Sequence, residues 1–280
     1  MARITSLSIL LEAGGKDFLS ELYGQVIDNV EKNTISSALK NRALSGDPTS
    51  GSVEAKRFAN SQSSPYGTAR AAGAGSSVKA KPVVVQINND KEIVEEIEEK
   101  DIRLYGVDGL LTRRSVNHQK TMIRELERAF FNAAATAATA LTATATTPQE
   151  ILEALIQQIE TTKNDYVDGV PRDIINVIMT PGEYGKIRNY LDSGANNANV
   201  DTAQPEFGMF HGVRIYSSVY LPAGVKQLGM VNESVALPVF SDVYTAEKVP
   251  LSQAYAVSLF YYYGVAAVTP DLIVKIVDGA

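Results

Sequence analysis

The spacing of apolar residues predicts two amphipathic helices in the first half of the chain. Between Phe18 and Leu44, apolar side chains recur at near-helical spacing and predict an N-terminal helix or helical arm. A longer helix is predicted from Ser115, as its N-cap, through Phe131 into an alanine-rich tract. The apolar positions behind these predictions are Leu19, Leu22, Val26, Val30 and Leu39 in the first helix, and Val116, Met122, Ile123, Leu126, Ala129, Phe130 and Ala133 in the second.

Two further helices are predicted to begin with the same N-terminal sequence pattern. Thr147–Glu150 and Thr180–Glu183 each combine a Thr-x-x-Glu capping box with proline at the first helical position. The second box follows a predicted buried strand, Ile174–Met179. Between the long helix and the first box lies the uncharged Ala/Thr tract 134–147, which predicts the end of that helix, a linker and a subdomain boundary.

Beyond Phe207 the pattern is typical of strands separated by Gly- and Pro-containing turns. A β-branched run at Lys81–Ile87 adds an earlier strand. The predicted fold class is therefore α+β, with a mixed sheet in the second half of the chain. The predicted late strands are Val213–Val219, Gln227–Val231, Val235–Phe240, Tyr255–Val265 and Leu272–Val277.

A segment poor in core-forming residues interrupts this pattern. Of the 33 residues 45–77, 21 are Gly, Ser, Ala or Pro, and the only large apolar side chains are Val53, Phe58 and Tyr66. Such a segment is either a disordered linker or an extended loop that becomes ordered only against another subunit. The acidic run 90–101 that follows permits a helix or a continued strand, and the pattern alone does not decide between them.

Composition excludes several functional classes. The formal net charge of −6 argues against a protein whose main task is binding nucleic acid phosphates, and the absence of cysteine excludes disulfides, thiol catalysis and thiolate metal sites. The two histidines, His118 on a predicted solvated helix face and His211 in a turn, lack neighbouring ligands for a zinc site. The uncharged stretch 249–270 is rich in Tyr, Val and Phe, which favours core strands over a membrane span.

No motif nominates a catalytic residue, a cofactor or a metal. Gly73-Ala74-Gly75 lacks the third glycine and the preceding strand of a dinucleotide-binding loop. A run of acids is usually a solvated face, and Tyr261, Tyr262 and Tyr263 favour core and interface packing over a base-stacking platform.

The remaining functional signal in the sequence is a contrast in charge between two neighbouring segments. Residues 53–82 hold five basic residues against one acid, a net charge of +4, whereas residues 90–101 hold two bases against seven acids, a net charge of −5. The basic loop can fold onto its own acidic segment or reach that of a neighbouring copy in a repeating assembly. The residues expected to make contacts between subunits are Lys56, Arg57, Phe58, Tyr66, Arg70, Lys79, Lys81, Glu95, Glu96, Glu98 and Glu99.

The serial order of these elements resembles the major capsid proteins of tailed bacteriophages, with the Hong Kong 97-type fold. The resemblance covers nearly the whole chain and includes the Met-Thr-Pro and Leu-Pro-Ala-Gly segments. The runs that carry it are 177–184, 207–218, 221–224, 263–266 and 270–276.

The resemblance implies a division of the chain. It gives an N-terminal helical arm at 1–47, an extended loop at 48–81, a peripheral domain at 82–147 and 266–280, and an axial domain at 148–265. A spine helix is expected at about 113–140, within the peripheral domain.

The resemblance also implies the function: a non-enzymatic shell subunit, forming hexamers and pentamers around double-stranded DNA that it does not bind sequence-specifically. It implies location in the virion after assembly in the host cytoplasm, with a separate scaffolding protein and a portal as partners, and no membrane. The alternatives are an encapsulin-like nanocompartment around protein cargo and, as a third class, an unrecognised soluble hydrolase.

Overall fold

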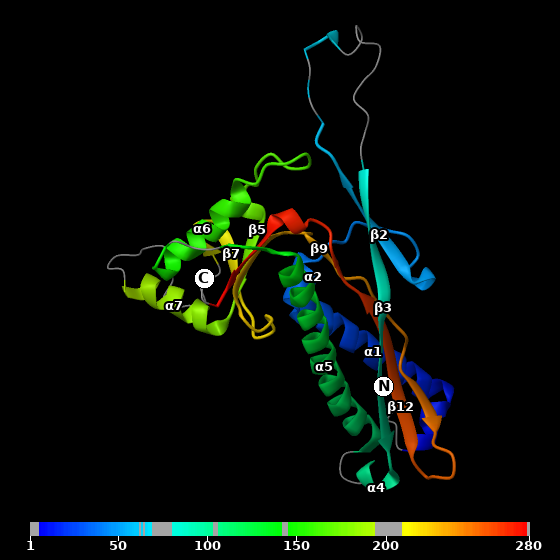
Figure 1. Ribbon diagram of the computed structural model, residues 1–280. Helices are drawn as coiled ribbons and strands as arrows, with labels where there is room; N and C mark the ends of the chain where they lie inside the picture. Colours follow the sequence, from blue (N-terminus) through cyan, green and yellow to red (C-terminus); the bar gives the residue numbers. More distant parts are fainter. Residues whose placement is uncertain are drawn as a thin grey trace.

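The computed structural model describes residues 6–61, 63, 65–68, 80–102, 106–141, 145–193 and 209–278. Figure 1 shows two sheets, each with its own helices, and a β-ribbon that projects from the first sheet. The chain first passes to the second sheet at the end of the long helix α5 (Gly106–Ala137), returns to the first sheet after β8 (Val225–Val231), and enters the second sheet again after β12 (Tyr255–Gly264).

The first sheet is antiparallel and has one face covered by helices. In its strand β12, Val257, Leu259, Tyr261 and Tyr263 are buried, whereas the residues between them are half-buried, which is the alternation of a sheet covered on one side. The strand order is β1-β2-β3-β12-β10, and β11 also pairs with β12. The strands are β1 (Leu44–Ser45), β2 (Ser52–Phe58), β3 (Ala80–Ile97), β10 (Val239–Ser241), β11 (Thr245–Lys248) and β12 (Tyr255–Gly264).

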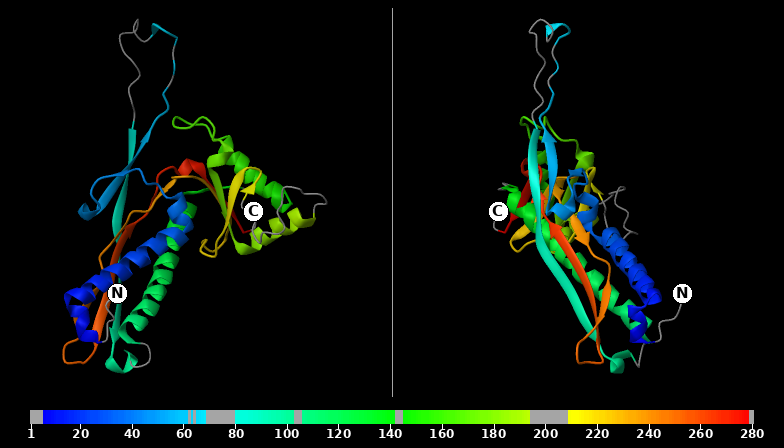
Figure 2. Two further views of the ribbon diagram at one scale, coloured as in Figure 1. Left: turned by 180° about the vertical axis from the view of Figure 1, so that it is seen from behind. Right: turned by 90° about the vertical axis from the view of Figure 1, so that its right-hand side faces the viewer.

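Helices α1 and α5 lie along the buried face of this sheet (Figure 2). The predicted apolar residues of the N-terminal helix are buried in the core they share with α5 and β12, so the helix is confirmed but is packed against its own chain. The helical elements here are η1 (Leu7–Leu11), α1 (Ala13–Asn33), α2 (Ile35–Leu39), η2 (Pro48–Ser50), α4 (Glu99–Ile102) and α5 (Gly106–Ala137).

The long helix begins earlier than the sequence suggested. It starts at Gly106, where φ is +72°, and Val107 and Leu111 of its first turns are buried. Ser115 lies inside the helix, with its Oγ donating to the Thr112 carbonyl at 2.8 Å, so the prediction that it caps the N-terminus is wrong. A serine hydroxyl can bond the preceding turn of a helix as well as cap one, and the sequence pattern does not separate the two.

The second sheet is mixed, as predicted. The strand order is β4-β14-β8-β5-β7-β6; β14 runs parallel to β4 and β5 parallel to β7, and the remaining pairs are antiparallel. Two short strands, β9 (Val235–Ala236) and β13 (Ala266–Ala267), pair separately. The sheet strands are β4 (Thr139–Ala140), β5 (Ile175–Met179), β6 (Met209–Phe210), β7 (Val213–Ser217), β8 (Val225–Val231) and β14 (Ile273–Val277).

Helices α6 and α7 follow the two capping boxes and pack on this sheet. At the first box, the Thr147 hydroxyl donates to the Glu150 carboxylate at 2.5 Å, and the Ile151 amide donates to the Thr147 carbonyl at 3.1 Å. Leu152, Leu155, Ile156 and Ile159 are buried beneath α6. The helical elements here are α6 (Pro148–Glu160), η3 (Arg172–Ile174), α7 (Pro181–Ser193) and η4 (Pro270–Leu272).

Two strands pair across the domain boundaries that were expected from the sequence. Strand β12, expected in the axial domain, pairs with β3 over ten positions, and β14, expected in the peripheral domain, pairs with β8 of the second sheet. Both predictions relied on serial order, and strand partners far apart in the sequence are not encoded in that order. The acidic run is strand as far as Ile97, so the charged residues extend β3.

Candidate assembly surfaces

The projecting ribbon is formed by β2 and by Ala80–Gln86 of β3, and it is anchored in its own chain at its base. We call residues 52–86, which include these two segments, the arm. β2 pairs position by position with Ala80–Gln86 of β3. Val53 and Ala55 are buried and pack with Val85, with Ala236 of β9 and with Val268, which follows β13. The prediction that this segment becomes ordered only against another subunit is therefore wrong for residues 52–58. A two-residue alternation of small apolar side chains is enough to fix a strand when a valine-rich partner lies beside it.

A polar cluster holds the outer end of β2 to the second half of the molecule. The Nη1 and Nη2 atoms of Arg57 each lie 2.6 Å from a carboxylate oxygen of Asp271, and the Arg57 guanidinium carbon lies 4.3 Å from the centre of the Tyr166 ring. The Asn60 amide donates to the Asp165 carbonyl at 3.0 Å. We call these five residues, together with Asn164, the latch.

Arg57, predicted as a contact between subunits, forms an ion pair within its own chain through the latch. Asn164 also donates to Asp271. Burial acts to raise the pKa of Asp271, but the bonds from Arg57 and Asn164 outweigh it and hold that pKa below its ordinary value. A hollow of about 550 Å³ adjoins the latch, and its lining includes Lys81, Val83 and Pro270.

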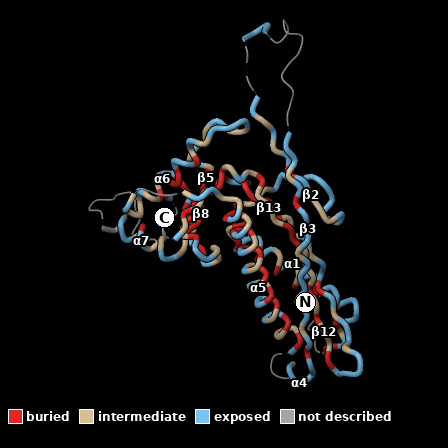
Figure 3. Tube along the Cα trace, in the orientation of Figure 1, coloured by how far each residue is buried: buried red, intermediate tan, exposed pale blue. Residues whose placement is uncertain are grey.

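Beyond the latch, the described part of the arm leads away from the rest of the chain (Figures 1 and 3). Phe58 is 55% exposed and Tyr66 is 94% exposed. Lys56 and Lys81 are also exposed. The remaining predicted contact residues of the arm, Arg70 and Lys79, lie outside the described residues. Large aromatic side chains in such positions are typical of a surface that binds a partner.

The uncovered face of the first sheet is acidic and aromatic. Along β3, Asp90, Glu92 and Glu96 are exposed on alternate positions. In the register with β12, Asp90 lies opposite Tyr262 and Glu92 opposite Phe260, both half-buried. We call this surface the acidic face. Of the other predicted acidic contact residues, Glu98 and Glu99 are exposed at the end of β3, and Glu98 pairs with Lys100 at 2.6 Å.

Glu95, also predicted as a contact between subunits, points the other way, toward α5. It forms an ion pair with Arg114, and its Oε2 lies 3.1 Å from Nε2 of His118 without the alignment of a hydrogen bond. His118 Nδ1 is hydrogen-bonded to the Tyr244 hydroxyl at 2.8 Å. Hydrogen bonding to Arg114 outweighs burial and lowers the pKa of Glu95.

His118 is 3% exposed, so its expected position on a solvated helix face is wrong. Burial lowers the pKa of His118 despite the nearby Glu95, and burial also raises the pKa of Tyr244. The cluster joins β3, α5 and the segment before β11, so we interpret it as structural.

The predicted packing role of the tyrosines is confirmed for Tyr261 and Tyr263, which are 1% and 5% exposed. Their hydroxyls donate to the Glu125 carboxylate at 2.5 and 3.3 Å, and Lys91 lies 2.9 Å from the same group. Burial acts to raise the pKa of Glu125, but bonds from Tyr261 and Lys91 leave that pKa below its ordinary value.

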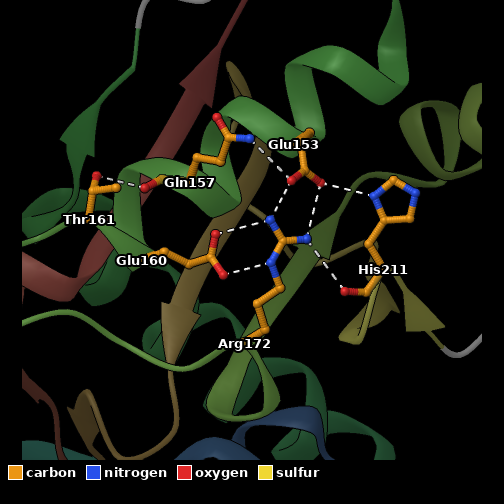
Figure 4. A network of polar contacts seen from close by, with 6 residues as sticks. All are labelled: Glu153, Gln157, Glu160, Thr161, Arg172 and His211. Carbon is orange, nitrogen blue, oxygen red and sulfur yellow. Dashed lines mark hydrogen bonds and ion pairs between the residues drawn. The ribbon is translucent and has the colours of Figure 1, made fainter.

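A second polar network ties α6 to η3 and to the β6–β7 turn (Figure 4). Arg172 bridges Glu153 and Glu160, with its Nε 2.6 Å from Glu160 Oε1, and His211 Nδ1 lies 3.1 Å from Glu153 Oε2. The Arg172 bond is the main cause of a lowered pKa at Glu153. The lowered pKa keeps Glu153 ionised, so this carboxylate is not suited to general acid catalysis.

Within the described residues, no group of three or more His, Asp or Glu side chains is placed to hold a metal ion. Among those same residues, no helix is long and apolar enough to cross a membrane. What the described surface offers is therefore an exposed aromatic and basic arm and a separate acidic face.

Comparison with known proteins gives the family. The phage capsid protein family model matches residues 84–276, which is more than half of the chain. The chain belongs to the phage capsid protein family. The resemblance stated from the sequence is thereby confirmed. No curated protein matches the chain.

Solved structures show that this capsid protein has the expected fold. A structure from Mycobacterium phage Che8 matches with a TM-score of 0.62 and 16% identity, over 81% of this chain and 84% of that one. The capsid structure of the cyanophage P-SCSP1u matches with a TM-score of 0.63 and 15% identity, over 87% and 88%. A virus-like particle from Pyrococcus furiosus matches with a TM-score of 0.57 and 13% identity, over 91% and 97%.

Proposed function

We propose that this capsid protein is the major capsid protein of a tailed phage, which assembles as hexamers and pentamers into an icosahedral or prolate shell around double-stranded DNA. The observation that carries the proposal is the arm, which extends beyond the core of its own chain and exposes Phe58 and Tyr66 (Figure 3). Exposed aromatic side chains of this size gain most when a second copy covers them.

The charges indicate where the arm binds. Lys56 and Lys81 are exposed near the arm, and Asp90, Glu92 and Glu96 line the acidic face of the first sheet. We infer that the arm of one copy lies across the acidic face of the next. Each exposed ion pair contributes only about 0–1 kcal/mol, but a pair repeated around a closed shell selects the partner and the register.

The overall charge is compatible with a shell that holds DNA. A net charge of −6 per subunit gives a lining that repels the packaged polyanion, so the DNA is enclosed without sequence-specific binding. A separate scaffolding protein and a portal are the further partners of such a shell, and the host cytoplasm is the place of assembly. A strongly basic inner surface in an assembled particle would contradict this lining.

The test is removal of the distal part of the arm. Replacing residues 61–78 by a short Gly-Ser turn keeps every β2–β3 pair and the latch. Expressed with the phage's own scaffolding protein, wild-type chain is expected to form closed particles in negative-stain images. The deletion variant is expected to stay soluble, with unchanged circular dichroism and melting temperature, and to form no closed shells. Normal particles from the variant would refute the role of the arm.

A second candidate is an encapsulin-like nanocompartment shell that encloses protein cargo. The observation that favours it is the Pyrococcus furiosus virus-like particle, 97% of whose chain is covered by the match. The same expression experiment separates the two, since a phage capsid is expected to need its scaffold. Small uniform shells formed by the purified chain alone would favour the nanocompartment.

A further inference from the structure

The latch is built on a loop that is itself held rigidly. Residues 161–169 leave the end of α6 and fold back on themselves: the Asn164 amide donates to the Val167 carbonyl at 2.8 Å, and the Gly169 amide donates to the Thr162 carbonyl at 3.0 Å. At the root of this loop, Glu160 is fixed by Arg172 in the network of Figure 4. These hydrogen bonds and the Glu160–Arg172 ion pair thus fix the positions of Asp165 and Tyr166 beside the arm.

Arg57 reaches the loop 161–169 because successive side chains of β2 point to opposite faces of the strand. Val53 and Ala55 point into the core, and Arg57 is the next residue on the same face of β2. Its side chain is 12% exposed and that of Asp271 is 27% exposed, so the two-point ion pair is partly shielded from water. A bidentate arginine–carboxylate pair in such a setting fixes direction as well as distance.

We propose that the latch sets the direction in which the arm leaves its own subunit before any neighbour is met. The segment beyond Asn60 is then the only part of the arm that adapts to a second copy. This inference builds on the proposed function, because a preset arm reduces the conformational entropy lost when two copies dock. It concerns the isolated subunit, so it does not require that closed shells form.

The test compares two adjacent residues of β2 in the full-length unassembled chain. Arg57→Ala removes the latch, and Lys56→Ala is the matched control because Lys56 points to the opposite, exposed face. The reporter is the Asn60 amide, whose bond to Asp165 joins the arm to the loop. Its hydrogen exchange can be followed by mass spectrometry with electron-transfer fragmentation.

We expect Arg57→Ala to speed exchange of the Asn60 amide about tenfold or more, while the amides of the β2–β3 ladder keep their protection. Lys56→Ala is expected to change neither. Tyr166→Leu provides a second variant that leaves the ion pair in place and weakens the cation–π contact, and it is expected to lie between wild type and Arg57→Ala.

A distance measurement checks the same point. The chain has no cysteine, so spin labels at Phe58→Cys and Gln158→Cys are site-specific. A narrow distance distribution that broadens with Arg57→Ala would support the proposal. It would be overturned if the Asn60 amide exchanged at the unprotected rate in wild type, or if Arg57→Ala and Lys56→Ala behaved alike. Neither result bears on whether wild-type chain forms shells, which the arm deletion tests separately.

Discussion

Arg57 and Asp271 are separated by 214 positions in the sequence, and their side chains meet in a two-point contact with both N–O distances at 2.6 Å. This contact joins the base of a projecting arm to η4, directly before the last strand of the second sheet. The arm is therefore held to the body of its own subunit up to Asn60, and within this held part Lys56 and Phe58 remain exposed to a partner.

Reversing the charge of the acidic face is expected to impair assembly without impairing folding. The double variant Glu92→Lys/Glu96→Lys replaces two exposed carboxylates opposite half-buried β12 positions. Because a basic arm would then meet a basic face, we expect several-fold fewer closed particles in sedimentation profiles. The control Glu21→Lys/Asp28→Lys makes the same change in net charge on exposed positions of α1 and is expected to assemble nearly normally. Equal yields from the two double variants would argue against the acidic face.

Glu127 illustrates a buried carboxylate with a structural task. It is 2% exposed, and its Oε1 accepts a 2.7 Å bond from the Ser36 amide at the start of α2. Glu127→Ala leaves that amide unpaired and is expected to cost about 1–3 kcal/mol of unfolding free energy in urea titrations.

Glu127→Gln keeps an acceptor and removes the charge. Burial raises the pKa of Glu127 in the folded state, so its contribution to stability is present below the unfolded pKa and is lost as the pH rises through the folded value. At pH 7, Glu127→Gln should equal or exceed wild type in stability, with the difference vanishing in acid. A large loss of stability at pH 7 would contradict this interpretation.

Protonation of the buried His118 is expected to give a different pH dependence of folding stability. Its pKa is lowered mainly by burial, and the charged or polar groups facing it are Glu95, Arg114 and Tyr244. The folded state thus binds the proton less readily than the unfolded state, so stability is full above pH ~6.5 and falls as the pH drops through the lower folded value. Urea midpoints between pH 7.5 and 5.5 should fall in wild type and change less in His118→Gln. If the urea midpoints of wild type and His118→Gln fell in parallel as the pH was lowered, protonation of His118 would not be the cause of the lost stability.

Two glycines make a matched pair for backbone packing. A Cβ at Gly264 would lie 2.3 Å from the Gln86 carbonyl oxygen, at the point where the β3–β12 register shifts, whereas one at Gly185 in α7 would meet nothing within 4 Å. Gly264→Ala is therefore expected to lower the unfolding free energy by about 1–3 kcal/mol. Gly185→Ala is expected to raise it by about 0.5–1 kcal/mol. Similar melting temperatures for the two variants would show that the strands separate more easily than the packing indicates.

The sequence predicted the elements whose signals are local. Several elements depend on residues a few positions apart and are confirmed: the helix starts at Pro148 and Pro181, the buried faces of α1 and α6, and the strands of the second sheet. The first capping box itself is not formed, because the Thr147 side chain makes no hydrogen bond to a backbone amide. The start of α5 was missed because serine is a common N-cap, and the sequence pattern does not show that Ser115 lies inside the helix.

The contacts that the candidate residues make within their own chain could not be predicted, because a local charge count does not show which face of a strand a residue occupies. Glu95 and Glu96 are neighbours in the sequence, yet one pairs with Arg114 and the other is exposed. Lys56 and Arg57 are also neighbours, and Lys56 is exposed whereas Arg57 pairs with Asp271. The partner of Arg57 lies near the end of the chain, so no local pattern could have indicated the latch.

The account depends on the distal arm binding a sister molecule, and a cryo-electron microscopy map of particles assembled from wild-type chain tests this most directly. Density for Phe58 and Tyr66 should run over the exposed side of β3 in an adjacent copy, near Glu92 and Glu96. Density showing those two aromatic residues folded back onto their own subunit, with the β3 surface uncovered, would contradict it.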